Sequence, residues 1–173
     1  THGRGGAEGP LAITRRVPLR LVPGPPGRAT VMALFADVRS AVDAVTAVIR
    51  RRVVPATLEL IDAESLKAVS EHLGRSVAPD QTGAMLIVEA DGTETTVRED
   101  IDQVGHACRQ AGALDVVPAA DEDQRDRLWS ARRLISMALR ATGLLKINHD
   151  VVVPRGRVPE LFAAIDDIRE AYH

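Results

Sequence analysis

Side chains that could bind an anion are grouped in the last third of the chain. Arg132 and Ser136 lie in a segment whose apolar residues recur at helical spacing, so they share one face of a helix, one turn apart. A guanidinium and a hydroxyl in that arrangement could hold a carboxylate. Arg133 is the neighbour of Arg132, and Lys146 and His149 follow on the next segment. The alternative is an ordinary amphipathic helix whose arginines face the solvent.

The sequence gives weaker signs of metal or phosphate chemistry. The five histidines form no His-x-His or His-x-x-x-His pair, and Cys108 is the one cysteine. We therefore predict no metal site and no internal disulfide in this chain. The Gly-rich residues 3–9 could approach a phosphate, but a dinucleotide-binding loop lies between a strand and a helix. Here the next predicted element is a strand, so composition alone favours a flexible end.

Composition and charge exclude several classes of protein. The 173 residues are 45% apolar and 27% charged with a net charge of −2, which is not the composition of a disordered chain. The basic residues number 22 and the acidic residues 24, and aromatic residues make up only 2%. This balance argues against nucleic acid as a partner. No apolar stretch reaches the roughly 20 residues of a membrane-spanning helix, and a single cysteine suits a reducing cytoplasm.

Patterns of apolar residues divide the chain at a connector rich in Pro and Gly, residues 23–27. Before it, a broken alternation over residues 11–22 predicts an edge strand that Pro18 bends. After it, strands are predicted over 29–36, 57–61, 84–89 and 114–117, and helices over 38–49, 63–73 and 95–111. This order predicts an α+β fold, a ferredoxin-like split βαβ sandwich whose antiparallel sheet has helices on one face.

An appendage follows the predicted sandwich. It consists of a helix over 121–141, a strand over 144–153 that ends at Pro154, and a helix over 159–172 with its apolar residues turned inward. The predicted anion-binding side chains lie on the first helix and on the strand of this appendage.

Four short motifs resemble one known family. They are residues 6–14 (GAEGPLAIT) with 19–23 (LRLVP), 58–62 (LELID), 128–132 (LWSAR), and 150–155 (DVVVPR) with 158–161 (VPEL). In this order they resemble FAD-linked oxidases of the vanillyl-alcohol oxidase type. That family includes the FAD subunit of glycolate oxidase and the D-lactate and D-2-hydroxyglutarate dehydrogenases.

The resemblance implies a domain division and roles for particular residues. Residues 1–23 would be the tail of an FAD-binding domain, and 24–173 the C-terminal substrate or cap domain, truncated at its C-terminus. Glu8, Gly9 and Ile13 would contact FAD. Arg132 would pair with the substrate carboxylate, and Ser136 and Lys146 would contact the same substrate.

Some positions depart from the family pattern. Pro10 and Ala12 replace the usual Thr and Gly of the FAD-contacting loop, and His149 stands where Glu is common. Because Ala adds a Cβ and Pro lacks an N–H, these changes affect how closely the loop can approach FAD.

As a function, the resemblance implies FAD-dependent oxidation of a 2-hydroxy acid of the glycolate or D-lactate type, by hydride transfer to the flavin. Most of the FAD site, and the ligands of a divalent metal in the complete enzyme, would lie outside this chain, which is expected to be inactive alone. The implied partners are the small hydroxy acid and either an electron-transfer subunit or a second copy. The implied location is the cytoplasm, with peripheral contact to the membrane left open.

Two alternatives remain at this stage. One is a stand-alone ferredoxin-like binding or assembly module without catalysis, which would use an open face of the sheet for a ligand or for self-association. The other keeps the flavin but changes the substrate to a phenol or an alkyl-glycerone phosphate, and a carboxylate-binding Arg132 argues against the phenol.

Overall fold

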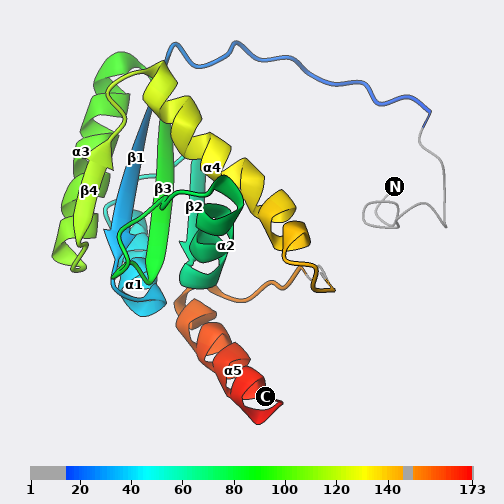
Figure 1. Cartoon of the computed structure of the whole chain (residues 1–173). Helices are drawn as coiled ribbons and strands as arrows, with labels where there is room; N and C mark the ends of the chain where they lie inside the picture. The colour runs from blue at the N-terminus through cyan, green and yellow to red at the C-terminus, as the bar shows by residue number, and fades with distance from the viewer. Residues whose placement is uncertain (1–14, 146–149, 173) are drawn as a thin grey trace.

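The computed structural model describes residues 15–145 and 150–172. Its strands are β1 (Gly27–Phe35), β2 (Thr57–Asp62), β3 (Ala84–Gly92) and β4 (Asp115–Pro118). Its helices are α1 (Val38–Arg50), α2 (Ala63–Leu73), α3 (Glu94–Gln110), α4 (Glu122–Ala141) and α5 (Val158–Ala171), with a short 3₁₀ helix at Arg155–Arg157 (Figure 1). The four strands and three helices predicted for the sandwich are all present, within a few residues of the predicted bounds.

The strands form one antiparallel sheet in the order β2-β3-β1-β4. The central strands β1 and β3 pair along their whole length, from Gly27 opposite Gly92 to Phe35 opposite Ala84. This sheet and the alternation of strands and helices confirm the predicted α+β, ferredoxin-like class.

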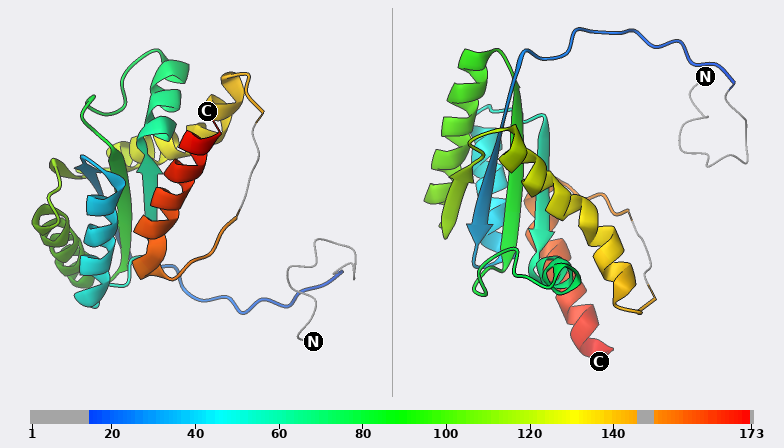
Figure 2. Two further views of the ribbon diagram at one scale, coloured as in Figure 1. Left: turned by 90° about the horizontal axis from the view of Figure 1, so that it is seen from below. Right: turned by 45° about the horizontal axis from the view of Figure 1, so that its top comes forward.

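Alternating residues of the strands build a core on each face of the sheet. On one face, Val31 and Phe35 of β1 and Leu86 of β3 belong to a buried cluster that includes residues of α1 and α3. On the other face, Ile87 of β3 packs in a cluster with Trp129 of α4 and a residue of α2. Figure 2 shows α1 and α3 on one side of the sheet and α2 and α4 on the other.

This second core corrects one part of the prediction. The prediction placed helices on one face of the sheet only. It is correct for α1 and α3, but the opposite face is also covered, by α2 and α4. The reason is that the strands carry apolar residues at both phases of their alternation, which is the pattern of a sheet buried on both sides. The open sheet face that the binding-module alternative requires is therefore taken up by the chain's own helices.

The helix boundaries follow from local signals in the sequence. Asp37 begins α1 as its N-cap residue, accepting a hydrogen bond from the Ser40 backbone N–H at 2.7 Å. Gly74 ends α2 in the left-handed conformation, with φ of 64°, which glycine adopts without strain.

Two predicted strands are wrong within the described residues. Residues 15–22 are an exposed, irregular stretch that runs away from the sheet (Figure 1), and residues 144–145 and 150–153 are likewise not in a strand. In both segments most apolar side chains are exposed, Leu21 at 88% and Val152 at 94%. Without a neighbouring strand to pair with, an alternating pattern does not make a sheet. The remainder of these two ranges, 11–14 and 146–149, lies outside the described residues.

The last helix, α5, packs less closely than predicted. Leu161 and Phe162 are half-buried, whereas Ile165 and Ile168 of the predicted inner face are 49% and 60% exposed. The helix lies beside the β2 edge of the sheet and contacts α1 (Figure 2).

A first prediction concerns Gly83, just before β3. Its N–H donates to the Phe35 carbonyl oxygen at 2.9 Å, and a Cβ there would lie 2.0 Å from the Ala36 carbonyl oxygen. Because the clashing atom belongs to the backbone, we expect Gly83→Ala to lower the free energy of unfolding by about 3 kcal/mol in urea titrations. The matched control is Gly24→Ala, where a Cβ meets nothing within 4 Å. Equal stability of the two variants would contradict this close packing.

A second prediction concerns the buried thiol of Cys108. Burial raises its pKa from 9.0 to about 11, although the neighbouring Arg109 lowers it. The unfolded chain therefore loses this proton at a lower pH than the folded chain does. The stabilising effect is complete below pH 9 and is lost as the pH rises through about 11. We expect the free energy of unfolding to fall more steeply over this range in the parent than in Cys108→Ala, and parallel pH profiles would contradict the assignment.

Candidate functional site

A surface pocket of about 410 Å³ lies where the β2 edge of the sheet meets the helices of the second face. Strand β2 supplies four consecutive lining residues, and α2, α4 and α5 complete the walls. The lining residues are Glu59, Leu60, Ile61, Asp62, Ser65, Arg132, Ile135, Ser136 and Phe162. The pocket thus contains both members of the anion-binding pair that helical spacing predicts on α4.

Trp129 fixes the position of α4 over the sheet. Its indole ring packs against the second core, and its Nε1–H donates to Glu89 Oε2 of β3 at 3.1 Å. The same carboxylate oxygen accepts a hydrogen bond from Thr30 Oγ1 of β1, also at 3.1 Å. Ile135 packs on the same face of the sheet. With Trp129 and Ile135 held there, Arg132 and Ser136 lie on the side of α4 that faces the β2 edge.

Arg132 forms an ion pair across the pocket with Glu59 of β2. Arg132 Nη2 lies 3.3 Å from Glu59 Oε1, and the two side chains are 46% and 33% exposed. The adjacent Arg133 does not line the pocket, and its Nη2 donates to Ser130 Oγ of the same helix at 2.9 Å. The structure therefore separates the two arginines that the sequence analysis groups together.

Carboxylates outnumber cations in the described part of the pocket. Asp62 lines the wall beside Glu59, and its Oδ1 accepts a hydrogen bond from the Ser65 backbone N–H at 3.0 Å, which caps α2. The lining therefore contains one guanidinium and two carboxylates, of which Asp62 is engaged in a helix cap. Sequence reasoning did not identify Glu59 as a site residue. The available signal was a charged side chain between two leucines in the 58–62 motif.

The other predicted site residues cannot be placed relative to this pocket. Lys146 and His149, and the proposed FAD contacts Glu8, Gly9 and Ile13, lie outside the described residues.

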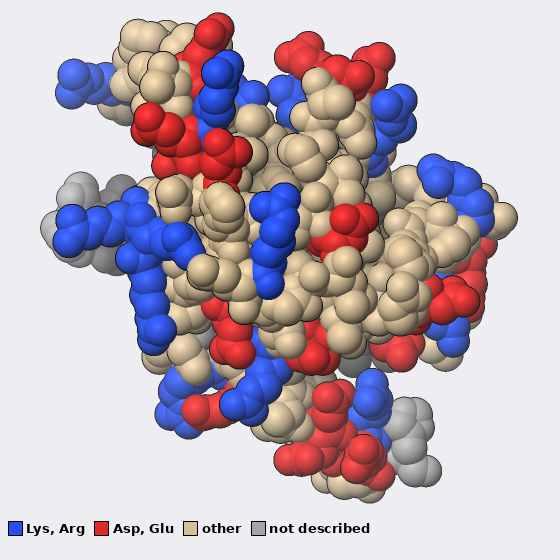
Figure 3. Space-filling view, turned by 90° about the vertical axis from the view of Figure 1, so that its left-hand side faces the viewer, with Lys and Arg blue, Asp and Glu red and all other residues tan. Residues whose placement is uncertain are grey.

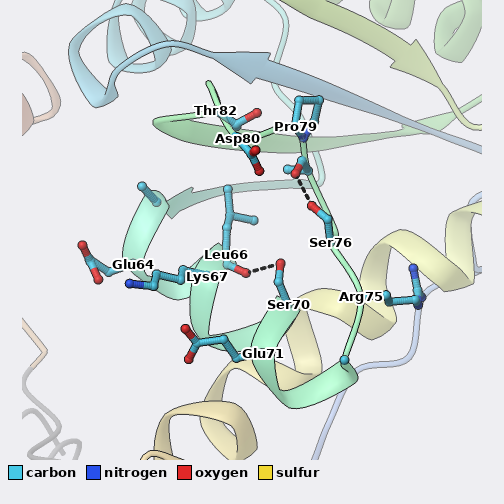
Figure 4. Close-up of a pocket in the computed structure, with 13 residues that line it drawn as sticks. Glu64, Leu66, Lys67, Ser70, Glu71, Arg75, Ser76, Pro79, Asp80 and Thr82 are labelled. Carbon is cyan, nitrogen blue, oxygen red and sulfur yellow. Dashed lines mark hydrogen bonds between the residues drawn. The ribbon is translucent and has the colours of Figure 1, made fainter.

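A larger pocket of about 640 Å³ lies between α2 and the loop of residues 74–82 (Figure 4). Its serines serve the loop itself: Ser70 Oγ donates to the Leu66 carbonyl oxygen at 2.8 Å and accepts from the Val77 N–H at 3.1 Å. Ser76 Oγ bonds to the Ala78 carbonyl oxygen. The bond from the Val77 N–H to Ser70 joins the loop to α2, so Ser70 is engaged in the fold. The pocket at Arg132 is the better candidate for a ligand site because it contains the predicted pair, Arg132 and Ser136.

Other surfaces offer less chemistry. On the face that carries α3 and β4, basic and acidic side chains are interspersed (Figure 3). Residues 15–145 and 150–172 contain no group of three or more His, Cys, Asp or Glu side chains placed to hold a metal ion. Within the same ranges, no helix is both long and apolar enough to cross a membrane.

These features define a ferredoxin-like α+β domain with an arginine-centred pocket at one sheet edge. Residues 25–173 match the sequence model of the FAD linked oxidases, C-terminal domain, and the chain belongs to this family. The resemblance noted in the sequence motifs is thereby confirmed.

Curated relatives agree with this assignment. The chain is 31% identical over 167 residues to glycolate oxidase subunit GlcD of Bacillus subtilis, covering 96% of this chain and 35% of the relative. It is 32% identical over 170 residues to GlcD of Escherichia coli K12, covering 96% and 33%. A probable mitochondrial D-lactate dehydrogenase of Danio rerio is 31% identical over 159 residues, covering 90% and 31%. The chain thus spans about a third of the length of these relatives.

A solved structure shares the fold. An alkyldihydroxyacetonephosphate synthase superposes with a TM-score of 0.59 at 17% sequence identity, covering 86% of this chain and 31% of the synthase. At that identity the likeness concerns the fold and not the substrate.

A third prediction tests the anchoring of α4. Trp129→Phe keeps an aromatic ring in the core but removes the donor to Glu89, so we expect the free energy of unfolding to fall by about 2 kcal/mol. Thr30→Val removes the other donor at nearly constant volume, and we expect a loss of about 1 kcal/mol. Unfolding is followed by circular dichroism, with Tyr172→Phe at an exposed position as the control. Stabilities equal to the parent would show that Glu89 does not anchor the helix.

Proposed function

We propose that this chain is the substrate-binding, C-terminal part of an FAD-dependent oxidoreductase that oxidises a 2-hydroxy acid of the glycolate or D-lactate type. The observation that carries the proposal is the meeting of Arg132 and Ser136 in one pocket. Relatives named glycolate oxidase subunit and D-lactate dehydrogenase support the choice of substrate. In this proposal residues 1–23 belong to the tail of an FAD-binding domain, and residues 24–173 to a substrate domain.

Arg132 has the donors that a carboxylate needs. A guanidinium carries five N–H groups, and Glu59 engages Arg132 through Nη2 alone. The donors that remain can hold a carboxylate in the paired geometry typical of arginine. At about 410 Å³, the pocket has the size of a small-molecule site. Ser136 lies on the same wall of the pocket, and its hydroxyl is proposed to contact the substrate. Lys146 is proposed to reach the same carboxylate.

FAD would be held elsewhere. When bound, the flavin supplies the acceptor for the hydride leaving the substrate α-carbon. We propose that the described residues do not hold the flavin by themselves. Their one buried side-chain polar atom without a hydrogen-bond partner is Thr82 Oγ1, which lines the pocket beside α2 and not the Arg132 pocket. We propose that Glu8, Gly9 and Ile13 contribute to FAD binding, and that the ligands of any divalent metal also lie beyond the described residues.

The proposal includes a partner for the reduced flavin. Because the bacterial relatives are named as subunits of glycolate oxidase, we propose an electron-transfer subunit as the partner, with a homodimer as the alternative. We propose a cytoplasmic location, with contact to the membrane surface where the electron acceptor is a membrane component.

A fourth prediction tests the role of Arg132. In a flavin-containing protein that includes this chain, we expect Arg132→Ala to lower kcat/KM for D-lactate or glycolate by about 2–4 kcal/mol of transition-state binding, because the carboxylate loses its charged partner. The assay follows reduction of an artificial electron acceptor. The matched control is Arg133→Ala, which removes the neighbouring charge outside the pocket and should leave the kinetics close to the parent. If kcat/KM of Arg132→Ala stays within twofold of the parent value, Arg132 is a surface residue and does not bind the substrate.

A further inference from the structure

Glu59 lines the pocket as a charged side chain, and neither the fold nor the proposed reaction assigns it a task. We propose that Glu59 is a positioning residue, which holds the Arg132 guanidinium in the orientation that receives the substrate carboxylate. This inference rests on the proposed function and deepens it, because it concerns how the same site binds its substrate.

The contact joins a rigid element to a flexible side chain. Glu59 lies in the middle of β2, where it pairs in register with Ile87 of the buried strand β3. Arg132 reaches Glu59 from α4, 73 residues away in sequence, through Nη2 at 3.3 Å. Arginine has a long side chain with many rotamers, and a fixed acceptor at one end of the guanidinium removes much of that freedom before substrate arrives. Such preorganisation favours binding because less ordering remains to be done.

The other charged groups near Arg132 are engaged with other partners, so Glu59 is the group that can position the guanidinium. Asp62 Oδ1 is engaged by the Ser65 N–H at the start of α2. Arg133, which could compete for the same carboxylate, bonds instead to Ser130. Within residues 15–145 and 150–172, the contact with Glu59 is the one ion pair or hydrogen bond found for Arg132.

The ion pair is too exposed for stability to explain it. Both partners keep a substantial part of their side chains in solvent, at 46% and 33%, and pairs of this kind contribute little to folding. Glu59 variants are therefore expected to fold, and an effect on the kinetics can be attributed to the site.

Positioning and simple electrostatics predict opposite results. If Glu59 acted only through its negative charge, it would repel a carboxylate substrate, and its removal would lower KM. If it positions Arg132, removal lets the guanidinium leave its orientation, and KM rises. The direction of the change in KM therefore distinguishes the two roles.

The experiment measures kcat and KM for D-lactate and glycolate in the flavin-containing protein that includes this chain. The variants are Glu59→Ala, Glu59→Gln, Arg132→Ala and the double variant Glu59→Ala with Arg132→Ala. We expect Glu59→Ala to raise KM by about three- to tenfold with kcat little changed, as for loss of uniform substrate binding. Glu59→Gln should restore KM to near the parent value, because its amide oxygen can accept the same hydrogen bond. In the Arg132→Ala background, Glu59→Ala should have no further effect.

Glu71→Ala is the matched control, because it removes the same charge from α2 at a position that lines other pockets and not the Arg132 pocket. A fall in KM for Glu59→Ala, or a rise of the same size in the Arg132→Ala background, would overturn the inference. If Arg132→Ala weakens kcat/KM while Glu59→Ala does not change KM, the inference fails and the proposed function stands. If Arg132→Ala itself has no effect, the proposed function fails and the inference fails with it.

Discussion

The docking of α4 on the second face of the sheet is the constraint on which the pocket depends. Its centre is the half-buried carboxylate of Glu89, which accepts hydrogen bonds from Trp129 of α4 and Thr30 of β1. A carboxylate at that depth needs partners, since burying a charge without them is costly. The indole N–H meets this need while its ring adds to the apolar core. The same residue thus ties the helix to the sheet by packing and by a directional bond.

Once α4 is held in this way, the pocket follows from geometry. Arg132 comes three residues after Trp129 and Ser136 four residues after Arg132, so both lie on the side of the helix turned toward β2. There the guanidinium meets Glu59, and Phe162 of α5 closes another side. An arginine with an exposed contact to one carboxylate keeps donors for a second one. This is the property that a domain binding an organic acid requires.

The sequence predicted the elements of the sandwich better than the segments before and after it. Strands such as β1 and β3 combine dense apolar runs with clear endings, and Gly74 marks a helix end by a conformation that few other residues adopt. Residues 11–22 carry a weaker alternation, and whether it forms a strand depends on a pairing partner elsewhere in the chain. That information is not local. The second core differs, because apolar residues at both phases of the strands already indicate it, and only the identity of the helices that cover it depends on where α4 docks.

In the site too, residues with a local sequence signal were predicted, and a contact between residues far apart in sequence was not. Helical spacing and the family motifs pointed to Arg132 and Ser136, and the structure brings both to one pocket. Glu59 was missed, although it stands in the 58–62 motif, because its contact with Arg132 spans 73 residues.

The most direct test of the account is a crystal structure of the flavin-containing protein with D-lactate bound. The account predicts the substrate carboxylate about 3 Å from the Arg132 guanidinium nitrogens, with Glu59 still in contact. A carboxylate bound elsewhere, with Arg132 turned to solvent, would contradict it.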